Sequence, residues 1–191
     1  MYKGTSASAG IGIGKAVIVK EEKLVITRKA VSDTAAEIRR VKGALEKTIK
    51  GTERIAGDLA ARVGEKEAEI MKGHMMLLSD PMLTGEIEGS IQNEGINSEI
   101  AVENVCSMYA DMFASMGDEL MQQRATDMRD LKTRLQKTLM GIQSVDISSL
   151  PKGSVIVAED LTPSMTAGIN PDNVTGIVTE LGGRTSHRAI L

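Results

Sequence analysis

The hydrophobic pattern of this chain changes period twice, and this change limits the folds that it can adopt. From Ser32 to Gly141 apolar residues recur with the 3.6-residue period of helices, whereas the flanking segments carry short β-branched runs typical of strands. The simplest assembly pairs the N-terminal strands with the C-terminal ones. We therefore expect an α/β half built from residues 1–31 and 142–191, with a helical bundle, residues 32–141, inserted into it.

Helix caps and amphipathic spacing divide the inserted region into five expected helices. Either Ser32 or Thr34 is expected to cap the first helix, and Glu37 has the spacing from Thr34 that a capping box requires. The expected ranges are 32–63, 65–79, 83–92, 98–116 and 119–140. A methionine-rich stripe on the fourth helix is more often core than a cofactor site, and we interpret it as core: Ile100, Val105, Met108, Met112 and Met116.

The flanking regions have the composition of short strands and turns. Residues 11–26 suggest two strands joined by a charged turn at 20–23, and their glycines do not complete a nucleotide-binding loop. Later in the chain we expect strands at 154–158 and 174–179 with a helical turn starting at Pro163 between them.

Composition excludes several classes of protein. The hydrophobic content of 41% can form a core, whereas a net charge of −3 with few aromatic residues argues against nucleic-acid binding. Cys106 is the single cysteine, so an internal disulfide is excluded and a reducing compartment is favoured. No signal peptide and no apolar run of about 18 residues is visible, so we expect a soluble, cytoplasmic protein without membrane insertion.

The C-terminal segment has the residues that could receive a phosphoryl group. Gly182 and Gly183 allow backbone N–H groups to approach an anion, Arg184 offers a fork of donors, and His187 can carry the group. The alternative interpretation is a turn that caps a helix and leaves His187 merely exposed. Local chemistry alone favours neither interpretation.

The sequence of this segment, G-G-R-T-S-H-x-A-I, closely resembles the phosphohistidine motif of Enzyme I of the bacterial phosphoenolpyruvate:sugar phosphotransferase system. Other segments with the same resemblance are Gly10–Ala16, Gly73–Asp80, Arg124–Asp130 and Ala158–Ser164. They occur in one order from end to end of the chain, so coincidence is a poor explanation for the resemblance.

The resemblance implies a swivelling α/β phosphohistidine half, with an inserted helical half that docks the phosphocarrier protein HPr. In the family, phosphoenolpyruvate phosphorylates the histidine on Nε2, here His187, and the group passes to a histidine of HPr. The family's sheet continues further, and its phosphoenolpyruvate-binding barrel holds Mg²⁺ and the homodimer contacts. We therefore expect a truncated enzyme fragment, with no metal site of its own, that cannot use phosphoenolpyruvate alone.

The resemblance also assigns individual residues. Gly182, Gly183 and Arg184 would stabilise the phosphoryl group, and Thr166 would orient the histidine, although an ordinary helix-surface threonine is its simpler interpretation. The positions that match the family's HPr-binding face are Met76, Leu77, Leu83, Met121 and Arg124. Without the resemblance, apolar residues at this spacing would be interpreted as core.

Several positions depart from the family or stand apart from its motifs. Pro81 and Met82 replace two acidic residues of the family's docking face, which leaves acidic residues elsewhere to steer HPr: Glu65, Glu67 and Glu86. Arg188 follows the histidine where the family has a small or hydroxylic residue; it can stabilise the phosphoryl dianion, disfavour imidazolium or point to solvent. Our hypothesis is that it slows release to HPr.

Two polar groups of the helical region are expected to be structural. We interpret His74 as a helix-packing or locally hydrogen-bonded histidine, because one histidine and one distant cysteine make no zinc site. Asp127, Arg129 and Asp130 have the spacing of a solvated or salt-bridged helix face.

Two alternatives to the sugar-uptake role stay open. The chain can belong to a specialised Enzyme I homologue that serves nitrogen regulation or dihydroxyacetone phosphorylation. It can also be an inert helical module that only docks HPr. The sugars served are chosen by downstream components of the pathway.

Overall fold

The computed structural model describes residues 4–21 and 23–181, and these form two compact units. One unit, residues 23–144, is helical. The other combines residues 4–21 with residues 145–181 around a parallel sheet. A chain that combines an all-α part with an α/β part confirms the predicted fold class.

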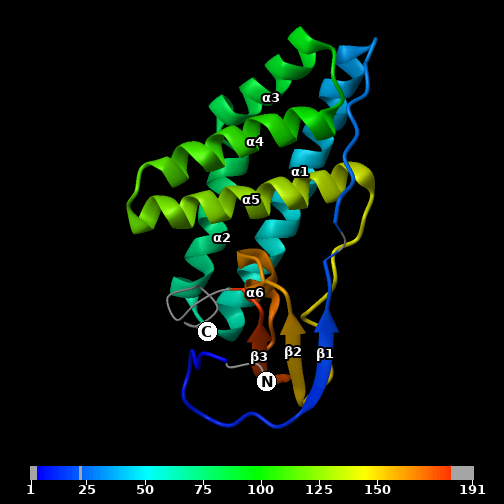
Figure 1. Cartoon of the computed structure of the whole chain (residues 1–191). Helices are drawn as coiled ribbons and strands as arrows, with labels where there is room; N and C mark the ends of the chain where they lie inside the picture. The colour runs from blue at the N-terminus through cyan, green and yellow to red at the C-terminus, as the bar shows by residue number, and fades with distance from the viewer. Residues whose placement is uncertain (1–3, 22, 182–191) are drawn as a thin grey trace. The chain divides into compact units, whose positions relative to one another are not determined.

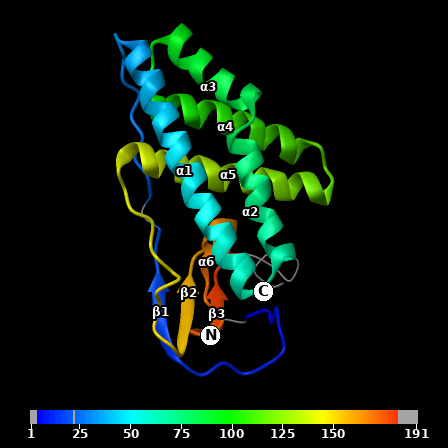
Figure 2. The same ribbon diagram turned by 180° about the vertical axis from the view of Figure 1, so that it is seen from behind.

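The helical unit contains α1 to α5 (Figure 1). Their ranges are Thr34–Arg62, Glu65–Leu78, Pro81–Glu94, Ser98–Ser115 and Glu119–Met140. Helix α1 lies beside α2, and α4 lies beside α5, which crosses the first pair (Figures 1 and 2). Their apolar faces meet in one core that includes Val41, Leu78, Ile87, Val102 and Leu131.

The start of α1 differs from the expected cap. Asp33 is the N-cap, and its Oδ1 accepts a hydrogen bond of 2.8 Å from the backbone N–H of Ala36. Glu37 does not complete a capping box on α1; its Oε1 instead accepts from the backbone N–H of Ser98 at 2.7 Å. A side chain of α1 therefore caps the first turn of α4, a tertiary contact that sequence spacing does not reveal.

An ion network joins the same two helices. The Arg40 guanidinium pairs with Glu37 and with Glu99, so one cation of α1 is held between two carboxylates. Burial alone would raise the pKa of Glu99, but hydrogen bonds from Arg40 and Asn97 and the charge of Arg40 lower it to about 2. Ionised Glu99 is therefore stabilised in the fold.

The segment before α1 does not form the second strand expected at 24–26. Instead, the backbone N–H of Val31 donates to Gly95 O at 2.8 Å, and Asn97 Oδ1 accepts from Lys29 N at 2.9 Å. Ala30 forms an isolated antiparallel bridge with Ile96. The turn between α3 and α4 thus pairs with the backbone of residues 29–31, just before α1, and not with the expected strand itself.

The α/β unit is a three-stranded sheet in the order β1-β2-β3, with all neighbours parallel. Its elements are β1 Lys15–Val19, β2 Ser154–Ala158, α6 Pro163–Gly168 and β3 Val174–Thr179, as expected for the last three. The small core of this unit contains Val19, Ile147, Ile156, Ala158, Leu161 and Ile169.

The glycines that precede β1 allow a close backbone approach. A Cβ on Gly12 would lie 2.1 Å from the carbonyl oxygen of Thr175, and one on Gly14 would lie 2.2 Å from that of Gly153. The register of β2 against β3 shifts beside Val155, and the Thr175 hydroxyl there lies 3.3 Å from Ile13 O. These glycines therefore serve packing, in agreement with the absence of a nucleotide-loop pattern.

Within residues 4–21 and 23–181, no helix combines the length and the apolar character that crossing a membrane requires.

Because its pKa is lowered in the folded state, Glu99 is expected to add stability that is complete above the unfolded pKa of 4.5 and lost as the pH falls toward about 2. Glu99→Gln should flatten the fall in unfolding free energy across this range. Urea unfolding followed by circular dichroism at several pH values checks it. Glu53→Gln, at an exposed position of α1, is the control; an equal flattening in both variants would contradict the assignment.

Candidate functional site

The predicted site residues fall in three groups. Gly182, Gly183, Arg184, His187 and Arg188 lie outside the described residues. Thr166 belongs to the α/β unit, and the predicted docking residues belong to the helical unit.

Thr166 is buried in the short helix α6, not on its surface. The helix starts where Thr162 accepts from the backbone N–H of Met165 at 3.4 Å, with Pro163 in the first turn. The Thr166 hydroxyl donates to Thr162 O at 3.0 Å. Since its proton is used inside the helix, the Thr166 oxygen can only accept a hydrogen bond from a further partner.

The predicted docking residues come from three helices. Met76 is 75% exposed on α2, whereas Leu77 beside it packs partly against the core. Leu83, in the first turn of α3, is buried and supports the surface from beneath. On α5, Met121 and Arg124 are half-buried. We call the surface formed by Met76, Leu77, Met121 and Arg124 the α2–α5 face.

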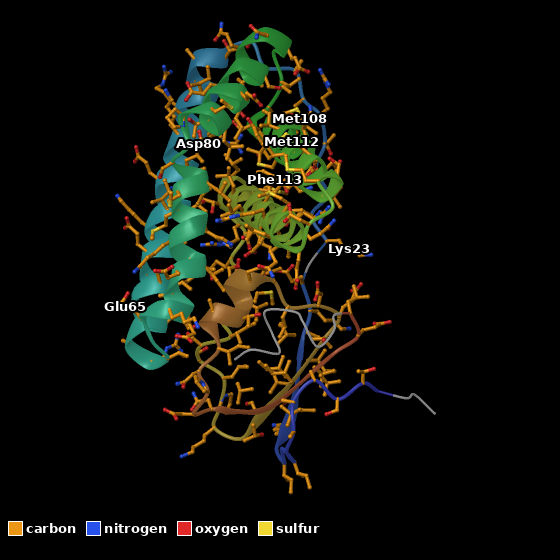
Figure 3. The ribbon with its side chains drawn as sticks, turned by 90° about the vertical axis from the view of Figure 1, so that its left-hand side faces the viewer. Lys23, Glu65, Asp80, Met108, Met112 and Phe113 are labelled. Atoms are coloured by element: carbon orange, nitrogen blue, oxygen red, sulfur yellow. The ribbon has the colours of Figure 1, made fainter. Side chains whose placement is uncertain are left out.

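Acidic groups lie at both ends of α2, where Figure 3 shows Glu65 and Asp80. Glu65 pairs with Lys72 at 2.9 Å, so part of its charge is compensated. Desolvation, a hydrogen bond with Glu86 and the charge of Asp80 raise the pKa of Tyr109 on α4. Glu86 and Asp80 thus give the adjoining ends of α3 and α4 a negative character.

A buried polar cluster lies between α2 and α5. His74 has no exposed surface, and its Nε2 lies 3.2 Å from Asp127 Oδ1, while its Nδ1 lies 4.0 Å from Asp130 Oδ2. His74 is therefore a packing histidine, as expected. Asp127 and Asp130 are buried and not solvated, whereas the salt-bridged alternative of the prediction is confirmed for Asp127, which pairs with Arg124. Only Arg129 of that group is exposed, with Asp111 3.9 Å away.

Arg134 and Arg124 extend this cluster to either side. Arg134 Nη2 donates to the Thr52 hydroxyl of α1 at 2.8 Å. Burial lowers the pKa of Arg134, and the charge of Asp130 opposes that shift. On the other side, Arg124 Nη1 lies 3.9 Å from Asp127 Oδ2.

One signal in the sequence could have revealed this cluster. Asp127 and Asp130 are three residues apart, so they share a helix face with the apolar core positions Met128 and Leu131 beside them. A lone histidine on the apolar helix α2 is a side chain that could contact these two carboxylates. What the sequence does not give is the pairing of α2 with α5.

Metal chemistry finds no support in the part of the chain that the structure describes. No three histidine, cysteine, aspartate or glutamate side chains gather there as metal ligands would.

The methionine stripe of α4 is not core along its whole length. Val105 is 7% exposed and Ile100 packs against the core, but Met108, Met112 and Met116 are 52%, 42% and 54% exposed. Figure 3 shows Met108 and Met112 along α4. The prediction of core was therefore wrong for the three methionines, because no helix among the described residues covers that side of the last turns of α4.

Two family models match the chain in order. The model for PEP-utilising enzymes, N-terminal, matches residues 3–124, and the model for the mobile domain of PEP-utilising enzymes matches residues 150–191.

Curated relatives named phosphoenolpyruvate-protein phosphotransferase align with nearly the whole chain. Those of Priestia megaterium and Bacillus subtilis are 41% and 39% identical over 99% of this chain and 33% of their own length. The chain thus spans about a third of these relatives.

Two solved structures have the same fold. A solution NMR structure of Enzyme I is 40% identical, with a TM-score of 0.87 over 100% of this chain and 77% of its own. The N-terminal domain of a protein described as Enzyme 1 - Nitrogen is 28% identical, with a TM-score of 0.68 over 96% and 76%.

The exposure of the α4 methionines can be tested by comparing a substitution at Met108 with one at Val105, a buried residue of the same helix. Met108→Gln should change the unfolding free energy by no more than about 0.5 kcal/mol, because the side chain already contacts water. Val105→Ala should lower it by about 2 kcal/mol, because it removes buried methyl groups. Urea unfolding of both variants measures these free energies. If Met108→Gln lowered the unfolding free energy as much as Val105→Ala does, Met108 would be part of the core after all.

Proposed function

The chain belongs to the family of PEP-utilising enzymes, and from this membership we propose that it is the phosphohistidine and carrier-docking region of a phosphoenolpyruvate-protein phosphotransferase. The observation that carries the proposal is the match of both family models in one order, the second of which includes His187. The reaction is the first step of sugar uptake by the phosphotransferase system.

In the first transfer, the Nε2 lone pair of His187 attacks the phosphorus of phosphoenolpyruvate. An N–P bond forms, the bridging P–O bond breaks, and the enolate of pyruvate leaves and takes up a proton. In the second transfer, a histidine nitrogen of HPr displaces Nε2 from the same phosphorus. Both steps need positioning and cationic or N–H stabilisation of the equatorial oxygens more than acid or base catalysis, which is the role of Gly182, Gly183 and Arg184.

Thr166 supplies the orientation in this scheme. Because its hydroxyl proton is donated to Thr162 O at 3.0 Å, its oxygen accepts from a neighbour. Acceptance from Nδ1–H of His187 fixes the tautomer whose Nε2 carries the lone pair. The burial of Thr166 supports a fixed position for this acceptor.

The α2–α5 face is the docking surface for HPr in this proposal. Met76 is exposed on α2, and the guanidinium of Arg124 lies against Gly73 three residues earlier on the same helix, so α2 and α5 offer an apolar contact and a donor. The carboxylates of Glu86 and Asp80 support an electrostatic attraction to a basic partner surface.

Phosphoenolpyruvate binding, Mg²⁺ and homodimer contacts belong to the barrel of the full-length enzyme in this proposal. The relatives are three times as long as the matched region, which leaves room for such a part. The 191 residues alone would then exchange phosphate with HPr but not with phosphoenolpyruvate.

The nitrogen branch is the second candidate. The solved nitrogen homologue is a weaker match than the Enzyme I structure, with TM-scores of 0.68 and 0.87, and this difference favours the sugar branch.

Phosphorylated HPr should transfer its phosphoryl group back to His187 of this chain. His187→Ala should abolish acid-labile label, whereas Thr166→Val should slow labelling about tenfold, because one hydrogen bond to the nucleophile is lost. Quenched-flow labelling measures both. Thr175→Val, which removes another hydroxyl of the α/β unit, controls for folding. Label that persists in His187→Ala would refute the assigned nucleophile, and binding without label would favour the inert docking module.

Docking should depend on the exposed apolar side chain and on salt. Met76→Glu should weaken HPr binding about tenfold, because it places a desolvated charge in the interface. Met140→Glu, at an exposed methionine at the other end of α5, should leave affinity unchanged. Isothermal titration at increasing ionic strength should show weakening of the wild-type complex. Equal effects of the two substitutions would place the interface elsewhere.

A further inference from the structure

Asn97 stands at the N-cap of α4, but its side chain does not cap that helix. An asparagine in this position usually accepts a hydrogen bond from a backbone N–H of the first helical turn. Here Oδ1 accepts from the backbone N–H of Lys29 at 2.9 Å, and Nδ2 donates to Thr27 O at 3.2 Å. Asn97 is therefore a buried side chain that binds the segment by which the chain enters the helical unit.

The hydrogen bonds of Asn97 continue through two charged side chains to the end of α5. Its Nδ2 also donates to Glu99 Oε2 at 2.8 Å, and both carboxylate oxygens of Glu99 accept from the Arg40 guanidinium. Nη2 of Arg40 donates in turn to Leu139 O at 3.0 Å, in the last turn of α5, where carbonyls lack helical partners. An unbroken path of hydrogen bonds therefore joins Thr27 to Leu139.

The two ends of this path lie near the places where the chain passes between its two units. The helical unit spans residues 23–144, so the chain enters it shortly before Thr27 and leaves it shortly after Leu139. Both places lie on the same side of the helical unit (Figures 1 and 2). Because Val19 and Ile147 are buried in the core of the α/β unit, the connections are the stretches between Val19 and Thr27 and between Leu139 and Ile147.

Packing of α1 against α4 does not require this path. Glu37 already joins these two helices, because it accepts from Ser98 N at 2.7 Å and pairs with Arg40. The additional bonds of Asn97 and Arg40 instead hold backbone outside α1 and α4, in the entering segment and in the last turn of α5.

We propose that Asn97, Glu99 and Arg40 form a clamp that fastens both connections to the helical unit and thereby shortens the tethers that carry the α/β unit. The length of a tether sets the effective concentration of the groups that it links. The three side chains are positioning residues, because they act through the connections and touch neither the partner nor the transferred group. The consequence for phosphoryl transfer rests on the proposed function. The fastening does not, because its contacts lie within the helical unit.

Amide hydrogen exchange of the free chain, followed by NMR, tests the path. Arg40→Gln should accelerate exchange about tenfold at the amides of Lys29 and Ile142, because the charged hydrogen bonds of Arg40 are lost. Neither amide is bonded to Arg40, since they donate to Asn97 Oδ1 and to Lys137 O at 2.9 Å each. Unchanged exchange at either amide would overturn the proposal.

Two further variants complete this test. Lys42→Gln removes another cation of α1, which pairs with Glu88 of α3 at 3.1 Å, and it should leave exchange at both amides unchanged. If Arg40→Gln does not fold, Asn97→Ala replaces it, because the Asn97 side chain caps no helix. This variant should accelerate exchange at Ile142, near the far end of the path. Unchanged exchange there, or equal acceleration in Lys42→Gln, would contradict the clamp.

Nitrogen relaxation of the free chain tests the shortening of the tethers. In Asn97→Ala the α/β unit should tumble with a shorter correlation time than in the wild type, because longer tethers couple it less to the helical unit. Arg28→Gln removes an exposed side chain of the entering segment that pairs with Glu94 at 3.4 Å, and it should leave this correlation time unchanged. An α/β unit that tumbles identically in the wild type and in Asn97→Ala would show that the clamp does not shorten the tethers.

Transfer from phosphorylated HPr measures the functional consequence. Release of the entering segment would leave the chain unattached from Val19 to the start of α1, about twice the present length, and labelling of His187 in Asn97→Ala should slow about threefold. HPr affinity should be unchanged, because Leu139 and Met121 lie at opposite ends of α5. An equal labelling rate in both proteins would exclude a role of the clamp in transfer. A wild-type chain that phosphorylated HPr does not label would instead refute the proposed function, and the exchange experiment would still decide the clamp.

Discussion

The parallel register of β1 on β2 is the constraint on which the rest of this fold depends. It places Lys15 opposite Ser154 and Val19 opposite Ala158, although the whole helical unit separates them in sequence. Parallel neighbours cannot be joined by a tight turn and need a crossover connection. Here residues 23–144 form that connection, and they have a core of their own. A substitution in one core is therefore expected to leave the other unit's packing intact.

Polar contacts, more than apolar ones, set the relative positions of the helices. Apolar cores tolerate many arrangements of similar volume, whereas a hydrogen-bonded charge has few satisfactory geometries. Glu37 and Arg40 join α1 to the start of α4, and His74 joins α2 to α5. The first junction is part-exposed and supports the fold. The second is buried between α2 and α5.

The sequence predicted elements well where their ends carry local signals. Helix α5 begins after Asp118, whose side chain accepts from Met121 N, and ends at Gly141 in the left-handed conformation, so its range was predicted correctly. The errors arise where a segment distant in the sequence determines whether a side chain is buried. The outer methionines of α4, such as Met112, were misplaced because the period identifies a stripe but not whether a neighbour covers it. The burial of Asp127 was not predicted, because His74, which covers it, lies on another helix.

The surroundings of His74, one of the two histidines of the chain, exclude it from phosphoryl transfer. His74 has no exposed surface and faces a carboxylate on each side, so phosphoenolpyruvate or a carrier histidine cannot approach it in line. Burial also raises the pKa of the Cys106 thiol to about 12, which excludes a thiolate acceptor at physiological pH. Phosphohistidine chemistry in this chain therefore has one candidate, His187. The other histidine, His74, is enclosed between α2 and α5 and serves the packing of the helical unit.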